Sequence, residues 1–139
     1  MALADENVAL VRRWFEEVWE RRRSEAIEEF LDEESVLHGD LGVMRGPDEF
    51  RAKMHTPFLA AFPDLKIEVE AVLASDQEVA FRWTATGCHT GDGLGMAPSN
   101  TDCCFRGMTW IRAVDGKMRE GWQVSNIPEI LRGLGTGLA

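Results

Sequence analysis

The sequence lacks the features of a membrane-spanning, secreted or nucleic-acid-binding protein. It has no run of about 18 apolar residues, so we expect no membrane span. Residues 1–6 have neither a basic start nor a long apolar stretch, so we expect a cytoplasmic protein without a secretory signal. Basic residues number 15 against 24 acidic ones, and Arg21–Arg23 is the only basic run. The resulting field repels phosphate groups, which argues against nucleic-acid binding.

Cysteine is also scarce. The three cysteines are Cys88, Cys103 and Cys104, and two of them are adjacent. Neighbours on a strand point to opposite faces, so Cys103 and Cys104 are not expected to form a disulfide. Reduced thiols in the cytoplasm are the simplest interpretation. Together with His89 and Asp102 these cysteines match no zinc-ligand spacing, so we expect no metal site.

No internal repeat, low-complexity tract or linker divides the chain. Its 139 residues predict one domain spanning residues 1–139. A folded chain of this size buries about two-thirds of the surface of its unfolded form, so a core can form without disulfides.

The first part of the chain has the periodicity of helices. Asp5 or Asn7 is a candidate cap for the first helix. Ser24 can cap a short second helix, and Gly46-Pro47-Asp48 predicts the start of a third. Pro57 should kink or interrupt the third helix, because proline has no backbone N–H to donate. The first helix carries an apolar stripe with spacings of three and four: Val11, Trp14, Phe15, Val18 and Trp19.

Strand patterns fill the rest of the chain. A short strand, Ser35–His38, precedes the third helix. Alternation then predicts strands over residues 65–74, 78–88, 101–114 and 117–126. Asp115-Gly116 is a tight hairpin signal, and short turns predict antiparallel pairing. Pro128 starts a short final helix. Helices followed by strands predict an α+β fold, with three helices lying on one curved antiparallel sheet to make a cup.

Several segments carry a resemblance to a known family. They run from about residue 6 to residue 135 and resemble the SnoaL-like polyketide cyclases, within the nuclear-transport-factor-like cone superfamily. Each segment is short, and their order and spacing carry the resemblance. The segments are Val11–Trp19, Gly46–Arg51, Ala60–Leu65, Arg82–Gly91, Leu94–Pro98, Asp115–Lys117, Gly121–Gln123 and Leu131–Gly135.

The resemblance implies a cone-shaped barrel of a curved, mainly antiparallel sheet. Three N-terminal helices would pack on its concave side, with a short C-terminal helix at the end. It also implies a homodimer formed through the sheet, a pocket for a small apolar organic molecule, and no metal or organic cofactor. In characterised members an aspartate after the last-strand tryptophan is the acid/base for ring closure by intramolecular aldol condensation. Here Gln123 follows Trp122, and Asn126 replaces a second acid three residues later.

Gln123 changes the chemistry that the resemblance implies. An aldol closure removes a proton beside a carbonyl and stabilises the enolate, for which a carboxylate of tuned pKa is suited. An amide side chain has no useful pKa and only donates or accepts hydrogen bonds. Gln123 can therefore polarise a carbonyl, as an oxyanion-hole amide does, but it cannot be the base.

Three histidines are candidates for the missing proton transfer or for ligand contact. His38 ends a strand expected to reach the cup, and its imidazole can act as a base near neutral pH. A structural histidine bonded to a carbonyl is the competing interpretation. His55 can face the pocket mouth or lie at an exposed helix end. His89 lies in Gly87–Gly91, where a role in turn geometry is favoured over a lid.

The remaining candidates would bind ligand. Trp14 and Trp83 are the preferred aromatic walls among five tryptophans, most of which we expect in the core. Met54 adds soft, adaptable lining. Asn126 can orient a ligand oxygen, although it is also well placed to cap the final helix before Pro128.

Three interpretations of the function remain open from the sequence. One is a SnoaL-like enzyme that acts on a small apolar carbonyl-bearing molecule by acid–base chemistry, with Gln123 positioning the oxygen and His38 or water moving the proton. The alternative is a non-catalytic protein that binds a small molecule in the same pocket. A structural dimer with a filled, vestigial pocket is a third possibility. The fold does not decide among them.

Overall fold

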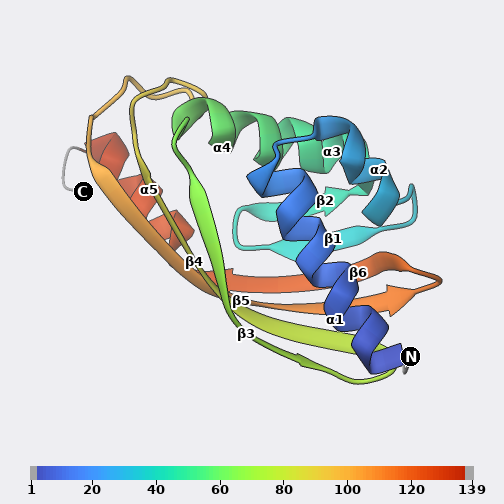
Figure 1. Ribbon diagram of the computed structural model, residues 1–139. Helices are drawn as coiled ribbons and strands as arrows, with labels where there is room; N and C mark the ends of the chain where they lie inside the picture. Colours follow the sequence, from blue (N-terminus) through green and yellow to red (C-terminus); the bar gives the residue numbers. More distant parts are fainter. Residues whose placement is uncertain (1–2, 137–139) are drawn as a thin grey trace.

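The computed structural model describes residues 3–136. Within them, a curved sheet carries its helices on the concave side, and a final helix lies at one end (Figure 1). This confirms the α+β fold expected from the order of helices and strands. No helix between residues 3 and 136 is long and apolar enough to cross a membrane.

The sheet is open. In the described residues its six strands follow the order β2-β1-β6-β5-β4-β3, which leaves β2 and β3 at the edges. Neighbours pair antiparallel except β1 and β6, which are parallel. The strands are β1 (Val36–Gly39), β2 (Gly42–Arg45), β3 (Lys66–Ala74), β4 (Glu78–Cys88), β5 (Asp102–Val114) and β6 (Lys117–Ser125).

The short strand β2 was not expected from the sequence. It forms a hairpin with β1, in which Leu37 pairs with Met44 and Gly39 with Gly42. Gly42 has a φ of +117°, a backbone conformation that glycine adopts without steric cost. A strand of four residues beside a glycine turn is too short for alternation to reveal.

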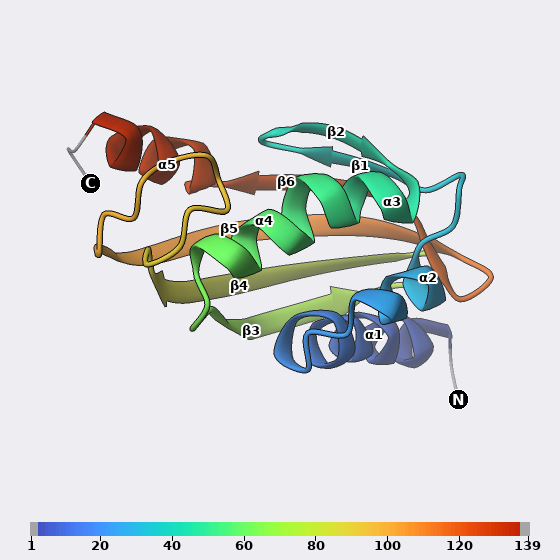
Figure 2. The same cartoon turned by 90° about the horizontal axis from the view of Figure 1, so that it is seen from above.

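The helices form two long units and two short ones. In the first unit, α1 (Leu3–Trp14) continues into a π-helical turn, η1 (Phe15–Glu20). A short 3₁₀ turn η2 (Ser24–Ala26) and α2 (Ile27–Phe30) follow, and the last described helix is α5 (Ile127–Thr136). The second unit is α3 (Gly46–Phe50), a π-helical turn η3 (Arg51–His55) and α4 (Thr56–Ala61). Figure 2 shows α1 beside β3 and α4 farther across the sheet.

Pro57 does not break the third helix. The Thr56 N–H donates to the carbonyl of Arg51, five residues back, which widens the helix just before the proline. The missing N–H of Pro57 is accommodated next to this wider turn, and such π-helical insertions are typical sites of irregular hydrogen bonding.

The predicted cap of the first helix is wrong. Asp5 and Asn7 both lie inside α1, which is already helical at Leu3. Asn7 is buried, and its amide donates to the carbonyls of Ser75 and Asp76 at 3.0 and 3.1 Å. This residue therefore joins α1 to the β3–β4 turn instead of capping the helix.

One extra residue interrupts the pairing of the last hairpin. Ala113 pairs with Met118, but Arg112 pairs with Glu120, so Arg119 forms a β-bulge in β6. The guanidinium of Arg119 bonds Asp32 and Glu34, at 3.1 Å in each case. The bulged residue is therefore tied to the segment between α2 and β1.

Inward-facing residues of the central strands build the core. On β4, Val79, Phe81, Trp83 and Ala85 alternate toward the helices and are all buried. Gly107 of β5 lies opposite Trp83, and a Cβ at Gly107 would approach the Trp83 indole to 2.5 Å. The indole of Trp83 therefore occupies the space that a side chain at residue 107 would fill.

We predict that Gly107→Ala displaces the Trp83 indole and destabilises the fold. Overpacking of a filled core costs about 1–3 kcal/mol, which urea unfolding will measure. Gly39→Ala is the control, because a Cβ there meets its nearest atom at an ordinary 3.4 Å. Equal unfolding free energies for the two variants would contradict the tight contact at Gly107.

Candidate functional site

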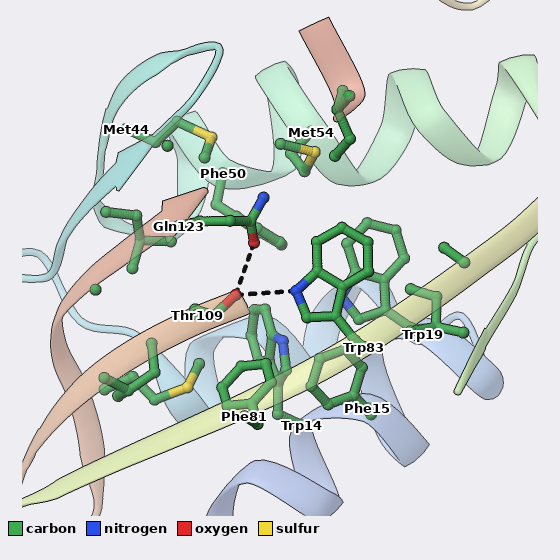
Figure 3. A pocket seen from close by; sticks show the side chains of 18 of the residues that line it. Trp14, Phe15, Trp19, Met44, Phe50, Met54, Phe81, Trp83, Thr109 and Gln123 are labelled. Atoms are coloured by element: carbon green, nitrogen blue, oxygen red, sulfur yellow. Dashed lines mark hydrogen bonds between the residues drawn. The ribbon is translucent and has the colours of Figure 1, made fainter. Parts of the chain in front are cut away.

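A pocket lies between the helices and the concave face of the sheet (Figure 3). Its cavity volume is about 120 Å³. Tryptophans wall this cavity without filling it. The labelled apolar side chains around it are Trp14, Phe15, Trp19, Met44, Phe50, Met54, Phe81 and Trp83.

The helical stripe predicted from the sequence supplies one wall. Trp14 ends α1, and its ring lies 5.0 Å from that of Phe50 and 5.6 Å from that of Phe30. Phe15 and Trp19 belong to η1 and are only partly buried. Phe15 makes an edge-to-face contact with Phe81 of β4 at 5.3 Å. Edge-to-face aromatic packing of this kind fixes ring orientations and builds a rigid wall.

A chain of hydrogen bonds crosses the floor of the pocket. The Trp83 indole N–H donates to the Thr109 hydroxyl at 3.0 Å. The Thr109 hydroxyl donates to Gln123 Oε1, also at 3.0 Å (Figure 3). An indole nitrogen can only donate, so the Thr109 proton is free for Gln123, and the amide oxygen is its acceptor. With Oε1 bonded to Thr109, the Gln123 Nε2 group points away from Thr109 (Figure 3), and Gln123 lines the pocket.

The rest of the lining is apolar. Among the described residues no aspartate, glutamate, lysine or arginine lines the pocket. The polar side chains that border it are Thr109, Gln123, His38 and the tryptophan indoles. Hydrogen bonds gain strength in a site of low dielectric, so the Gln123 amide is the dominant polar feature offered to a ligand.

The match to a family model decides the family. The model described as SnoaL-like polyketide cyclase matches residues 9–134. This chain belongs to the SnoaL-like polyketide cyclase family. No curated protein sequence matches it.

Solved structures share the fold of this chain. A proposed SnoaL-like polyketide cyclase from Jannaschia sp. CCS1 is 20% identical, with 97% of this chain and 95% of that chain covered and a TM-score of 0.84. AclR from Streptomyces galilaeus, a proposed hydroxylase, is 29% identical, with coverage of 96% and 83% and a TM-score of 0.80. A SnoaL-like polyketide cyclase from Agrobacterium tumefaciens is 20% identical, with coverage of 97% and 99% and a TM-score of 0.70.

In this SnoaL-like chain, five of the predicted site residues meet at the pocket. Gln123, Trp14, Trp83 and Met54 line it, and His38 borders it. Thr109, which the sequence analysis did not single out, connects two of them. Its position on the inner face follows from its alternation with Phe105, Gly107 and Ile111, but its partner depends on the strand register.

His38 does not aim its ring into the pocket. It borders the cavity, but it pairs with Trp122 across β1 and β6, and their rings stack at 5.7 Å. Its Nε2 lies 2.8 Å from Glu120 Oε2. Leu37 and Gln123 face the cup, so alternation puts His38 and Trp122 on the convex face. The role of His38 as a base stays a prediction, and the structure places its ring against Trp122 and Glu120.

His55 and His89 are buried structural residues. His55 Nε2 donates to the Val18 carbonyl at 2.6 Å, and its ring packs against Trp19 at 5.1 Å. His89 Nδ1 accepts from the Ser99 backbone N–H at 3.2 Å. Neither histidine lines the pocket. The ligand contact predicted for His55 stays a prediction, and the structure shows its ring joining η3 to η1.

Asn126 also lies outside the pocket lining. Its Oδ1 accepts from the Arg106 backbone N–H at 2.8 Å, and its Nδ2 donates to the Cys104 carbonyl at 3.3 Å. These bonds extend the β5–β6 pairing beyond the end of β6. The Ser125 hydroxyl, instead of Asn126, accepts from the Ile127 N–H at the start of α5. The ligand contact predicted for Asn126 stays a prediction, and in this structure backbone groups occupy both ends of its amide.

We predict that the burial of His55 makes stability depend on pH. Burial lowers the pKa of His55 below its ordinary value, so the folded protein holds it neutral. The unfolded chain takes up a proton at the ordinary pKa of about 6.5, so stability is full above that pH and is lost as pH falls toward the folded pKa. Urea unfolding from about pH 7.5 to about pH 5.5 will measure this loss.

His55→Gln should flatten the pH dependence, because it removes the group that titrates. His38→Gln is the control and should retain the dependence, because it leaves the buried His55 in place. If wild type and His55→Gln lose the same unfolding free energy between the two pH values, His55 is not the group responsible.

Proposed function

We propose that this protein binds a small, flat, largely apolar molecule with a carbonyl or hydroxyl oxygen, and positions that oxygen at the Gln123 amide. The observation that carries the proposal is the chain from Trp83 through Thr109 to Gln123. It fixes the amide so that Nε2 offers donor hydrogens to a cavity with aromatic walls. Concave, mostly apolar sites with a few placed polar groups are the usual form of small-molecule sites.

The described pocket lining supports binding and polarisation more directly than proton abstraction. An amide N–H aimed at a carbonyl oxygen stabilises the negative charge that develops there on enolisation. The lining has no carboxylate that would take the proton. In this site a water molecule or the ligand itself would have to accept it.

Ring closure of a polyketide ester is a second candidate function. It is favoured by the family match over residues 9–134. In this reaction Gln123 would hold the acceptor carbonyl while water removes the proton beside the donor carbonyl. The aromatic walls would hold the chain folded, so that the reacting carbons meet.

We predict that Gln123→Leu weakens the binding of 2-hydroxyanthraquinone, a flat probe with carbonyl groups. One neutral hydrogen bond contributes about 1 kcal/mol, which corresponds to a loss of about fivefold in affinity. Quenching of the pocket tryptophans will report binding. Val124→Ala is the matched control, because Val124 is adjacent but 76% exposed on the other face. Equal affinities for wild type and Gln123→Leu would contradict the proposed role.

A second substitution at residue 123 tests whether the protein turns its ligand over or only binds it. Gln123→Asp places a carboxylate where the family's acid/base lies, so it should gain or raise cyclisation of a polyketide ester. Mass spectrometry of the products distinguishes closure at unchanged mass, loss of water and gain of oxygen. If Gln123→Asp changes neither turnover nor ligand binding, position 123 is not the reaction centre.

We also propose that the protein forms a homodimer through the convex face of the sheet. Trp110 pairs with Trp122, and Met108 with Val124, so four apolar side chains lie together on β5 and β6. Their exposed fractions are 50, 40, 62 and 76% in that order. An exposed apolar patch of this kind is typical of an interaction surface. Glu120 and Arg112 on the same face supply both signs of charge, as a self-complementary two-fold contact needs.

We predict that Trp110→Lys gives a monomer. The introduced charge would be buried without a partner in the dimer, while the exposed position tolerates it in the monomer. Light scattering should give twice the chain mass of 15.6 kDa for wild type and the single mass for the variant. Leu3→Lys, on an exposed part of α1, should remain dimeric. A monomeric wild type would contradict this proposal.

A further inference from the structure

A second hollow lies beside the pocket, between the first helical unit and β3. Its cavity volume is about 420 Å³. The helical wall includes Arg12, Glu16 and Glu20, which share one side of α1 and η1 through spacings of four. The opposite wall is the start of β3, with Lys66 and Glu68. We call this hollow the β3 groove.

The β3 groove adjoins the pocket through shared walls. Phe15, Trp19, Leu65 and Ile67 line both hollows. All four are only partly buried. Phe15 and Trp19 lie in the π-helical turn η1, and π-helical turns occur frequently at functional sites. These four side chains mark the boundary at which the apolar pocket meets the polar groove.

The span from Gln123 to the groove sets the length of an occupant. Gln123 is on β6 and the groove is on β3, three strands away in the sheet order. Strands lie about 4.8 Å apart, so the span is about 14 Å. A ligand that reaches both therefore needs an apolar body of about three fused rings with a polar arm at the far end.

The groove is polar without favouring one sign of charge. Within the described residues, Arg12, Lys66, Glu20 and Glu68 form no salt bridge, while Glu16 is paired with Arg21 at 3.1 Å. β3 is an edge strand, so one side of its backbone has no strand partner. Hydroxyl groups suit this mixture, because each one both donates to carboxylates and accepts from cations or backbone N–H groups.

We propose that the β3 groove binds a hydroxyl-rich arm, such as a glycosyl group, of the molecule whose flat body occupies the pocket. The inference rests on the proposed function of the pocket and names the second half of its ligand. Partly exposed Phe15 and Trp19 offer apolar faces to the sugar ring, and Glu68 and Lys66 hydrogen-bond its hydroxyls.

The test compares 2-hydroxyanthraquinone with its O-glucoside, measured by tryptophan quenching and by calorimetry. The glucoside should bind wild type about fivefold more tightly, the gain expected from one additional net hydrogen bond. Glu68→Ala should remove this gain and leave the affinity of the aglycone unchanged. Glu70→Ala is the matched control on the same strand, because Glu70 lies outside the groove and pairs with Arg82 at 3.6 Å.

The outcomes separate the two proposals. Failure of the aglycone to bind overturns the proposed function of the pocket, and failure of both probes overturns the groove assignment with it. Equal binding of aglycone and glucoside overturns the groove assignment alone. The O-sulfate of 2-hydroxyanthraquinone is a further probe. If it binds more tightly than the glucoside, the groove assignment is also overturned, because the groove would then select an anion. The groove assignment is likewise overturned if Glu68→Ala still binds the glucoside more tightly than the aglycone.

Discussion

The β-bulge at Arg119 decides which face of the sheet Gln123 occupies. Before the bulge Val114 pairs with Lys117, and a regular hairpin would continue to pair Thr109 with Trp122. The extra residue shifts the register by one, so Thr109 pairs with Gln123. A shift of one residue exchanges the faces of every following side chain. Trp122 therefore moves to the convex side, and the amide enters the cup.

The fold was largely predictable from the sequence, because long periodic segments dominate it. The stripe from Val11 to Trp19 and the alternation on β4 and β5 are strong signals. The structural details that were not predicted from the sequence depend on tertiary contacts. Asn7 looks like a cap, but its amide bonds the β3–β4 turn. The strand β2 is too short to show a period.

The site was predictable where it follows from side-chain type and strand phase. Trp14, Trp83, Met54 and Gln123 line the pocket as expected. The surroundings of His38, His55 and Asn126 could not be predicted, because their partners are backbone groups and a carboxylate far away in the sequence. Thr109 could not be matched with Gln123, because the bulge that brings them together leaves no mark in the alternation.

The central claim is that the Gln123 amide donates to a ligand oxygen in an otherwise apolar cavity. The most direct measurement is the infrared carbonyl stretch of 9-fluorenone, a flat probe with one carbonyl, bound to the protein. A donated hydrogen bond lowers this frequency relative to an apolar solvent, and Gln123→Leu should return it to the solvent value. A bound carbonyl with the same frequency in wild type and Gln123→Leu would contradict the account.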